Sequence, residues 1–226
     1  MSELSDKSTD TTREQILRAA CRQFAANAYS SVSLDDILAE AAVTKGAMYF
    51  HFRSKHALAE AIMDARSATT RAAITGIMAR KMSGLETIID IVYLVGAQDY
   101  TTDVGRAGLN LMDSVGRIEG VQAKRLDEWV KGMSKAVARA IDEGDVLAGS
   151  DPEDVARLII AVYTGTRLTT ELNNIEQFLH NLEKSWSFIL PGFTVPDRIK
   201  YFTQFIHRRT TQAIKNWRSE GNGASS

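Results

Sequence analysis

The residues best suited to binding chemistry lie in the range 41–59, which contains no aspartate or glutamate. The formal net charge of the whole chain is −1 at pH 7, so contact with a polyanion must come from local clustering of cations. An acid-free stretch with several basic groups is such a cluster, and it predicts a surface that binds phosphate. Its basic and titratable residues are Lys45, His51, Arg53, Lys55 and His56.

The histidines and the cysteine form no catalytic or metal-binding pattern. His51 and His56 are five residues apart, the wrong spacing for two metal ligands on one helix face, and we expect no acidic partner for either. His180 and His207 are isolated, and Cys21 is the only cysteine, in an apolar stripe that makes it a core residue. The sequence therefore predicts no enzyme, no metal and no cofactor.

Apolar residues recur at helical spacing along most of the 226 residues, and no stretch alternates like a strand. We therefore predict an all-α fold. Pro152 and Pro196 mark helix starts, because proline is tolerated in a first helical turn. Further helices are expected from about residue 85, over roughly 103–114, over about 121–143, and from Ile175 to before Pro191.

Polar caps divide the first part of the chain into four helices. A hydroxyl just before a helix accepts a hydrogen bond from an exposed backbone amide, and a side chain three residues on can return it. The second and third of these helices are short and joined by a tight turn. The predicted caps are Thr12 (with Gln15), Ser33 (with Asp36), Thr44 and Ser54, the last for a helix reaching past Arg80.

Two short helices of this kind meet the requirements for reading DNA. The major groove is about 12 Å wide and admits one helix, whose N-terminal residues face the bases while the preceding helix crosses the backbone. The helix after Thr44 is short and acid-free, and the helix after Ser33 precedes it. The arrangement predicts a helix-turn-helix.

Residues 12–58 resemble the DNA-binding domain of TetR-type (tetracycline-repressor-like) regulators. The resemblance implies an N-terminal three-helix helix-turn-helix bundle, joined by a linking helix to a helical ligand-binding and dimerisation domain. The matching residues are Thr12–Leu17 with Ala20 and Phe24, Ser33–Ile37, and above all Val43–Lys55 with Leu58.

The resemblance assigns DNA contacts to the predicted recognition helix. Thr44 and Lys45 would reach phosphate and base edges. Gly46 and Ala47 are small enough for the helix to lie deep in the groove. Tyr49 would give its hydroxyl to a phosphate and its ring to a sugar or a thymine methyl group.

Residues outside the first turns of that helix would hold the DNA backbone. His51 and Lys55 are assigned to phosphates, Lys55 at a helix N-terminus whose amides also attract anions. The alternative for His51 is a surface histidine with no task. Ser33 would donate to phosphate as well as cap its helix. The residues assigned to the core are Met48, Phe50 and Phe52.

The second half of the chain is predicted to enclose a small-molecule site, because inward-facing aromatic and polar residues can line an apolar cavity. Core filling is the alternative for each candidate. Trp129 is the strongest, because charged neighbours mark its helix as amphipathic. The candidates are Tyr93, Leu109, Met112, Trp129, Met133, Tyr163 and Thr166.

Parts of this half resemble the γ-butyrolactone receptor branch of the family, which implies a lactone-type effector (a γ-butyrolactone, butenolide or related furan) and a cavity lined by Trp129. The chain departs from the branch at Asn110 and in the loop 114–122. Arg106 and Arg167 would either pair with acids or contact the ligand. The matching stretches are Arg106–Leu111, Glu128–Trp129, Val162–Arg167 and Trp186 with Leu190–Gly192.

These features predict a cytoplasmic repressor without a membrane segment. A homodimer would bind a palindromic double-stranded DNA operator, with half-sites about 34 Å apart, and the effector would release it. The dimer is expected to use the helices after Pro152 and Pro196. A regulator with an unrelated hydrophobic ligand, or a constitutive repressor, is the alternative. The predicted parts are a disordered arm (1–10), the helix-turn-helix (11–56), the ligand and dimerisation domain (57–218) and a disordered tail (219–226).

Overall fold

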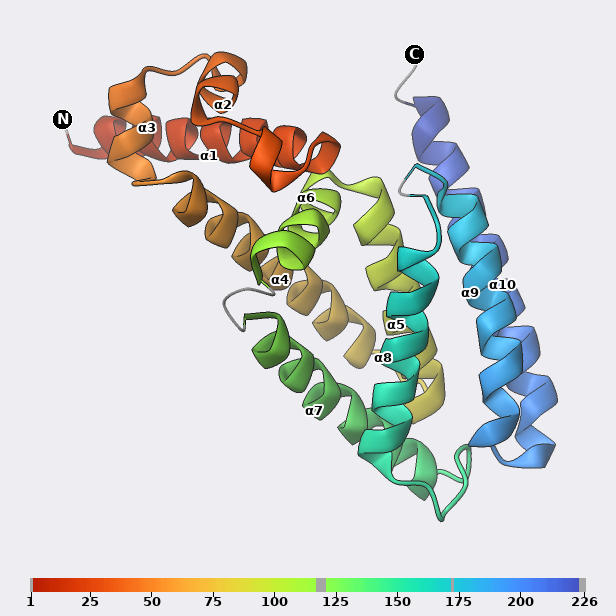
Figure 1. Cartoon of the computed structure of the whole chain (residues 1–226). Coiled ribbons are helices and arrows are strands. Elements are labelled where there is room, and N and C mark those ends of the chain that lie inside the picture. Colours follow the sequence, from red (N-terminus) through yellow and green to blue (C-terminus); the bar gives the residue numbers. More distant parts are fainter. Residues whose placement is uncertain (1, 117–120, 172, 224–226) are drawn as a thin grey trace. The chain divides into compact units, whose positions relative to one another are not determined.

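The computed structural model describes residues 2–116, 121–171 and 173–223, and in these ranges it contains ten α-helices and no β-strand (Figure 1). The all-α prediction is confirmed. The helices form two compact units. Unit 1 comprises residues 1–70 with 102–123, and unit 2 comprises residues 71–101 with 124–226.

Unit 1 holds the N-terminal helices, the first part of α4, and α6. Sequence analysis starts the first helix at Thr12, but α1 begins at Ser2, so that capping box is not at a helix start. Residues 2–10 contain neither proline nor glycine, so the helix can extend upstream. The linking helix ends at Met78 and does not pass Arg80. The bounds are α1 Ser2–Ala26, α2 Leu34–Ala41, α3 Lys45–His51, α4 Lys55–Met78 and α6 Asp103–Leu111.

The predicted caps of α2 and α3 are confirmed. Ser33 Oγ accepts from the Asp36 amide at 3.1 Å, and Asp36 Oδ2 accepts from the Ser33 amide at 2.8 Å. The Thr44 hydroxyl accepts from the Ala47 amide at 3.2 Å. Ala42 ends α2 at φ 52°, a left-handed conformation that turns the chain towards α3.

Helix α6 belongs to unit 1 although it follows α5 in the chain. The Asn110 amide donates to the carbonyls of Phe24 (3.0 Å) and Ala25 (3.4 Å), which lie in the last turn of α1, where carbonyls have no partner within the helix. A Cβ at Gly108 would lie 2.4 Å from Arg66 Cδ, so α6 packs closely on α4. The buried residues of the shared core include Ile16, Ala20, Phe24, Ile37, Met48, Leu58, Ile62, Ala107 and Leu111.

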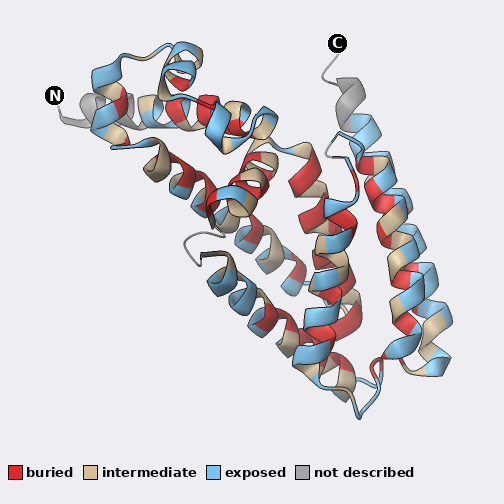
Figure 2. Ribbon diagram, viewed as in Figure 1, coloured by how far each residue is buried: buried red, intermediate tan, exposed pale blue. Residues whose placement is uncertain are grey.

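Unit 2 is a bundle around α5, whose apolar residues point in all directions. The predicted inward residues Leu85, Ile88 and Ile89 are fully buried, and Figure 2 shows α5 buried along most of its length. Helices α9 and α10 lie side by side (Figure 1). The bounds are α5 Gly84–Thr101, α7 Val121–Asp142, α8 Pro152–Leu168, α9 Ile175–Ile189 and α10 Pro196–Gly223.

The predicted division at residue 56 concerns function and stays a prediction. The predicted arm (1–10) and most of the predicted tail (219–226) lie outside the residues whose side chains are described. Among the helices of the described part, none is both long and apolar enough to cross a membrane.

The start of α5 packs on the backbone of α7, which requires glycine at position 84. A Cβ there would lie 2.5 Å from both Ala136 O and Ala140 N. We expect Gly84→Ala to lower the free energy of unfolding by about 2 kcal/mol, because neither backbone atom can move freely. Gly132→Ala on the open side of α7 is the control and should stabilise slightly through helix propensity. Equal stability of the two variants in urea denaturation would contradict this packing.

Candidate nucleic-acid interface

The outer face of α3 is open to solvent and carries the predicted DNA contacts. Thr44, Lys45, Gly46 and Tyr49 are exposed, and Ala47 is half-buried. A Cβ at Gly46 would meet nothing closer than the Thr44 hydroxyl at 4.0 Å, so the open surface extends over the backbone. This helix can therefore present small and polar residues to a surface that approaches it.

The structure corrects one core assignment on this helix. Met48 and Phe52 are buried as predicted, but Phe50 is 77% exposed. Residues two apart on a helix point about 200° away from each other, so the burial of Met48 turns Phe50 outward. Phe50 therefore adds an aromatic ring to the exposed face, and a helical projection of residues 45–51 would have found it.

His51 lies at the end of α3 between two aromatic rings. Its ring is half-buried, 5.0 Å from Phe50 in an edge-to-face contact and 6.5 Å from Phe52. These contacts fix the orientation of the imidazole. Its assignment to a DNA phosphate stays a prediction.

Lys55 has a structural task that sequence reasoning did not foresee. Its ammonium donates to the carbonyls of Tyr29 and Val32, both at 2.8 Å, and lies 4.3 Å from the centre of the Tyr29 ring. It thereby ties the start of α4 to the segment between α1 and α2. Any phosphate contact of Lys55 must share the ammonium with these two acceptors.

Ser33 and Lys45 also have acidic neighbours. The Ser33 hydroxyl donates to Asp36 Oδ2 at 2.6 Å, and this bond lowers the pKa of Asp36. Lys45 Nζ lies 4.0 Å from Asp35 Oδ1, and both side chains are largely exposed. An exposed pair of this kind is weak, so Lys45 can exchange Asp35 for a phosphate at little cost.

One expectation about the histidines is wrong. His56 Nε2 lies 3.8 Å from Glu60 Oε1 one helical turn later in α4. Helical spacing i to i+4 places these side chains together. Among the described residues, no group of three potential metal-binding side chains occurs.

The predicted ligand-binding residues fall into both units. Leu109 and Met112 are in unit 1, where Met112 packs against the core around α1 and α6. Trp129 is half-buried in unit 2 and packs against the cluster of Ile77, Ile91 and Val95. The other predicted residues in unit 2 are Tyr93, Met133, Tyr163 and Thr166, of which all but Tyr163 are buried.

Hydrogen bonds in unit 2 tie several of these side chains to their neighbours. The Tyr93 hydroxyl lies 2.7 Å from Thr210 Oγ1, and burial raises the pKa of Tyr93. Tyr163 donates to Asp99 Oδ2 at 2.5 Å. Bonds of this kind are also what a buried core tyrosine needs, so core filling remains the alternative for both.

The two predicted arginines lie in different surroundings. Arg106 Nη2 is 2.6 Å from Asp103 Oδ1, one turn earlier on α6, which fits pairing with an acid. Arg167 is buried, and its carbonyl accepts from the Tyr100 hydroxyl at 3.4 Å. Burial raises the pKa of Tyr100 to about 12.

Sequence reasoning missed the buried acids of α5. Asp90 and Asp99 are 6% and 1% exposed in a helix that is otherwise mostly apolar. A carboxylate among apolar neighbours requires a partner when it is buried. Their position in an apolar helix was a readable signal of a polar contact.

Comparison with known proteins gives matches in both sequence and structure. The family model described as "Bacterial regulatory proteins, tetR family" matches residues 16–62. The A-factor receptor protein of Streptomyces griseus is 30% identical over 199 residues, which cover 84% of this chain and 66% of that protein. The similarity thus extends well beyond the residues that the family model matches.

Two solved structures illustrate the match in fold. A gamma-butyrolactone receptor (ArpA like protein) is 26% identical with a TM-score of 0.76, covering 91% of this chain and 99% of that one. The TetR family protein CprB of Streptomyces coelicolor, in complex with its biological operator sequence, is 26% identical with a TM-score of 0.76, covering 90% and 98%.

The contacts of Lys55 predict a loss of stability on its replacement. Lys55→Met should lower the free energy of unfolding by about 2 kcal/mol, because two carbonyls lose a charged donor. Lys45→Met removes the same charge from an exposed site and should change it by less than about 0.5 kcal/mol. Thermal denaturation of both variants measures this difference. A stable Lys55→Met protein would show that the ammonium does not hold the segment.

Proposed function

This chain belongs to the tetR family of bacterial regulatory proteins, and on that basis we propose that it is a repressor that binds a palindromic operator as a homodimer. We further propose that a small lactone-type molecule releases it from DNA. The observation that carries the first part is the exposed, acid-free outer face of α3.

The geometry of α3 favours the major groove over a general anion site. The first turn presents Thr44, Lys45 and Gly46 to solvent, with no bulky side chain to hold the helix away from base edges. Tyr49 and Phe50 add two exposed rings on the following turn. Phosphate contacts would then position the helix, while small and apolar groups read the groove.

The outer face of α8 supports the proposed homodimer. Leu158, Ala161, Gly165 and Leu168 are exposed and recur at helical spacing, so they form one apolar stripe. Leu168 is 60% exposed, and a Cβ placed at Gly165 would meet no atom within 4 Å, so a second helix can approach closely. A two-fold contact through α8 and α10 would bury this stripe, which is the pairing predicted from the sequence.

The chain offers a physical route from the effector to the DNA-binding helices. Helix α4 begins in unit 1 and ends in unit 2. Helix α6 belongs to unit 1, but in the sequence it lies between α5 and α7 of unit 2. A ligand that binds two arrangements of unit 2 with different affinity would shift α4 and α6 with it. The two recognition helices of a dimer would then change their spacing.

Two observations support a lactone-type effector. The similarity to the A-factor receptor covers 84% of this chain, and the fold matches that of a gamma-butyrolactone receptor. Trp129 packs half-buried against a cluster of Ile77, Ile91 and Val95, which includes a residue of the linking helix, so a ligand beside its ring would act close to that helix. An unrelated hydrophobic ligand, or no ligand at all, is the alternative.

The proposal predicts salt-sensitive binding to an operator selected from a random DNA pool, measured by fluorescence anisotropy. Lys45→Met should weaken binding at least about tenfold and lower the slope of log affinity against log salt by about one per lysine removed. Phe50→Ala should weaken binding about tenfold with the slope unchanged, because the ring has no charge.

Lys184→Met on α9 is the matched control for charge and should bind like the unchanged protein. If Lys45→Met and Lys184→Met had the same effect, binding would depend on net charge and the assignment to α3 would be wrong. If no sequence were enriched from the pool, the proposed repressor function would fail.

Effector release should depend on Trp129. A synthetic γ-butyrolactone with an apolar side chain should dissociate the operator complex of the unchanged protein. With Trp129→Ala we expect release to need at least about tenfold more lactone, while operator affinity without lactone stays within about threefold. Phe188→Ala is the control, since Phe188 is an 83% exposed aromatic side chain on α9, outside the proposed dimer helices. If the lactone released the Trp129→Ala protein from the operator as readily as the unchanged protein, Trp129 would be a core residue without a role in effector binding.

A further inference from the structure

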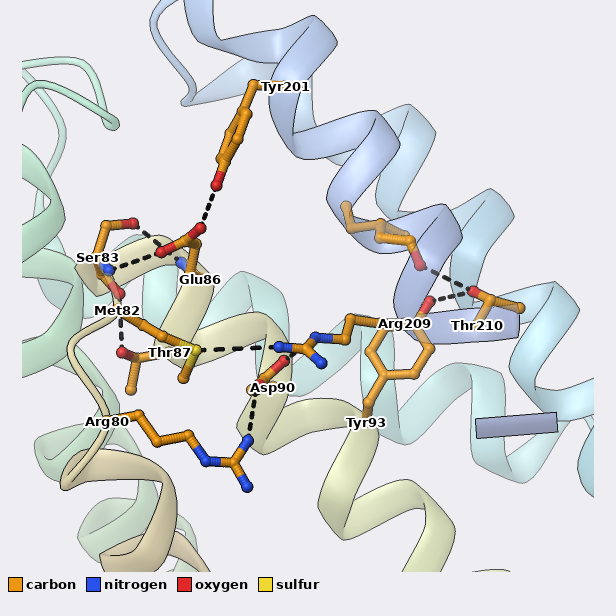
Figure 3. Close-up of polar contacts among 11 residues, drawn as sticks. Arg80, Met82, Ser83, Glu86, Thr87, Asp90, Tyr93, Tyr201, Arg209 and Thr210 are labelled. Atoms are coloured by element: carbon orange, nitrogen blue, oxygen red, sulfur yellow. Dashed lines mark hydrogen bonds and ion pairs between the residues drawn. The ribbon is translucent and has the colours of Figure 1, made fainter. Parts of the chain in front are cut away.

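Side chains of α5, α7 and α10 contact the segment between α4 and α5, and Figure 3 shows those of α5 and α10. Arg139 of α7 donates to the Met82 carbonyl at 3.2 Å and to Thr87 Oγ1 at 2.8 Å. The Ser83 amide donates to Glu86 Oε2 at 2.8 Å, which caps α5. These contacts hold Met82, Ser83 and the start of α5 within unit 2.

Asp90 connects this segment to α10. Its Oδ2 atom lies 3.4 Å from Arg80 Nη1, two residues after the end of α4. Its Oδ1 atom lies 2.5 Å from Arg209 Nε of α10, a close ion pair without the angles of a hydrogen bond. Figure 3 shows the two guanidinium groups on either side of the carboxylate.

The burial of Asp90 makes these contacts strong constraints. Its side chain is 5% exposed, whereas that of Arg80 is 58% exposed. A buried carboxylate without cations is costly, so Asp90 holds both arginines near it. Burial raises the pKa of Asp90, and the charges of Arg209 and Arg80 oppose that rise.

Two further contacts join α5 and α10 on either side of Asp90. The Tyr201 hydroxyl donates to Glu86 Oε1, and the Tyr93 hydroxyl lies 2.7 Å from Thr210 Oγ1. Helix α10 thus cannot slide along α5 without breaking polar contacts in three successive turns. Only Asp90 among these residues of α5 also reaches the end of α4.

We propose that Asp90 is a positioning residue that fixes the end of α4 relative to α10, and so sets the spacing of the two recognition helices in the dimer. This inference rests on the proposed function, because α10 is one of the proposed dimer helices. Loss of the ion pairs frees α4 to adopt a range of angles. The dimer then discriminates less well between operators with different half-site spacing. The effector also causes a smaller change in DNA affinity.

Hydrogen–deuterium exchange tests the anchor without DNA or effector. In the intact chain, Asp90→Asn and Arg80→Gln should each speed exchange of the Arg80 and Met82 amides at least about tenfold, since these amides close the turns after α4. Arg80→Lys keeps a cation and should restore most of the protection. Asp145→Asn is the matched control, because Asp145 is a buried carboxylate paired with Arg198 of α10 away from α4.

Operator spacing tests the consequence. One base pair inserted at the centre of the operator should weaken binding of the unchanged protein at least about tenfold. The same insertion should weaken binding of the Asp90→Asn protein less than about threefold. Asp145→Asn should discriminate like the unchanged protein, even where its melting temperature falls as far. If Asp90 had a purely structural role, Asp90→Asn would lower the stability of the protein but leave the ratio of its affinities for the original and the lengthened operator unaltered.

The two measurements separate the possible failures. Unchanged exchange in Asp90→Asn, or equal effects of Asp90→Asn and Asp145→Asn, would overturn the inference. If the unchanged protein bound no operator, the proposed function would fail, and the exchange data alone would decide whether Asp90 anchors α4.

Discussion

The surface of α3 that we propose to bind DNA depends on the burial of one side chain beneath this helix. A helix of seven residues has too few internal hydrogen bonds to be stable alone, so α3 keeps its shape through its contacts with the rest of unit 1. Met48 is fully buried in that core, and Thr44 caps the first turn. Because the face of α3 that carries Met48 is turned inward, the opposite face, which includes Phe50, must point to solvent. The burial of Met48 therefore fixes both the fold of the helix and the set of groups on its exposed face.

A second constraint acts in unit 2, where an apolar helix carries carboxylates. Burying Asp90 and Asp99 in α5 costs free energy unless each has partners. Arg80 and Arg209 provide them for Asp90, and Tyr163 donates to Asp99. Such pairs add little stability over an apolar core, but they specify which helices meet and in what register. In a regulator, that specificity is useful because small shifts between helices have to be reproducible.

Local patterns predicted most of the helices and most of the exposed surface of α3. Capping residues such as Ser33 and Thr44 act through neighbours three residues away, so their role can be read without knowing the fold. Errors arose where a local pattern had a stronger competitor. The predicted capping box at Thr12 lies inside α1, because residues 2–10 contain no residue that stops the helix. Phe50 was assigned to the core because it is apolar, without regard to the direction in which it points from the helix.

The sequence by itself determined the all-α class, the helix-turn-helix and the acid-free face of α3, because these follow from periodicity, capping and charge within a few turns of chain. Only the tertiary structure decided that Lys55 binds two backbone carbonyls, that α6 packs with α1, and that Asp90 joins α5 to Arg80 and Arg209. These contacts link residues from 10 to 119 positions apart. A partner so distant leaves no mark on the local pattern, since any compact packing of the same helices could have supplied a different one.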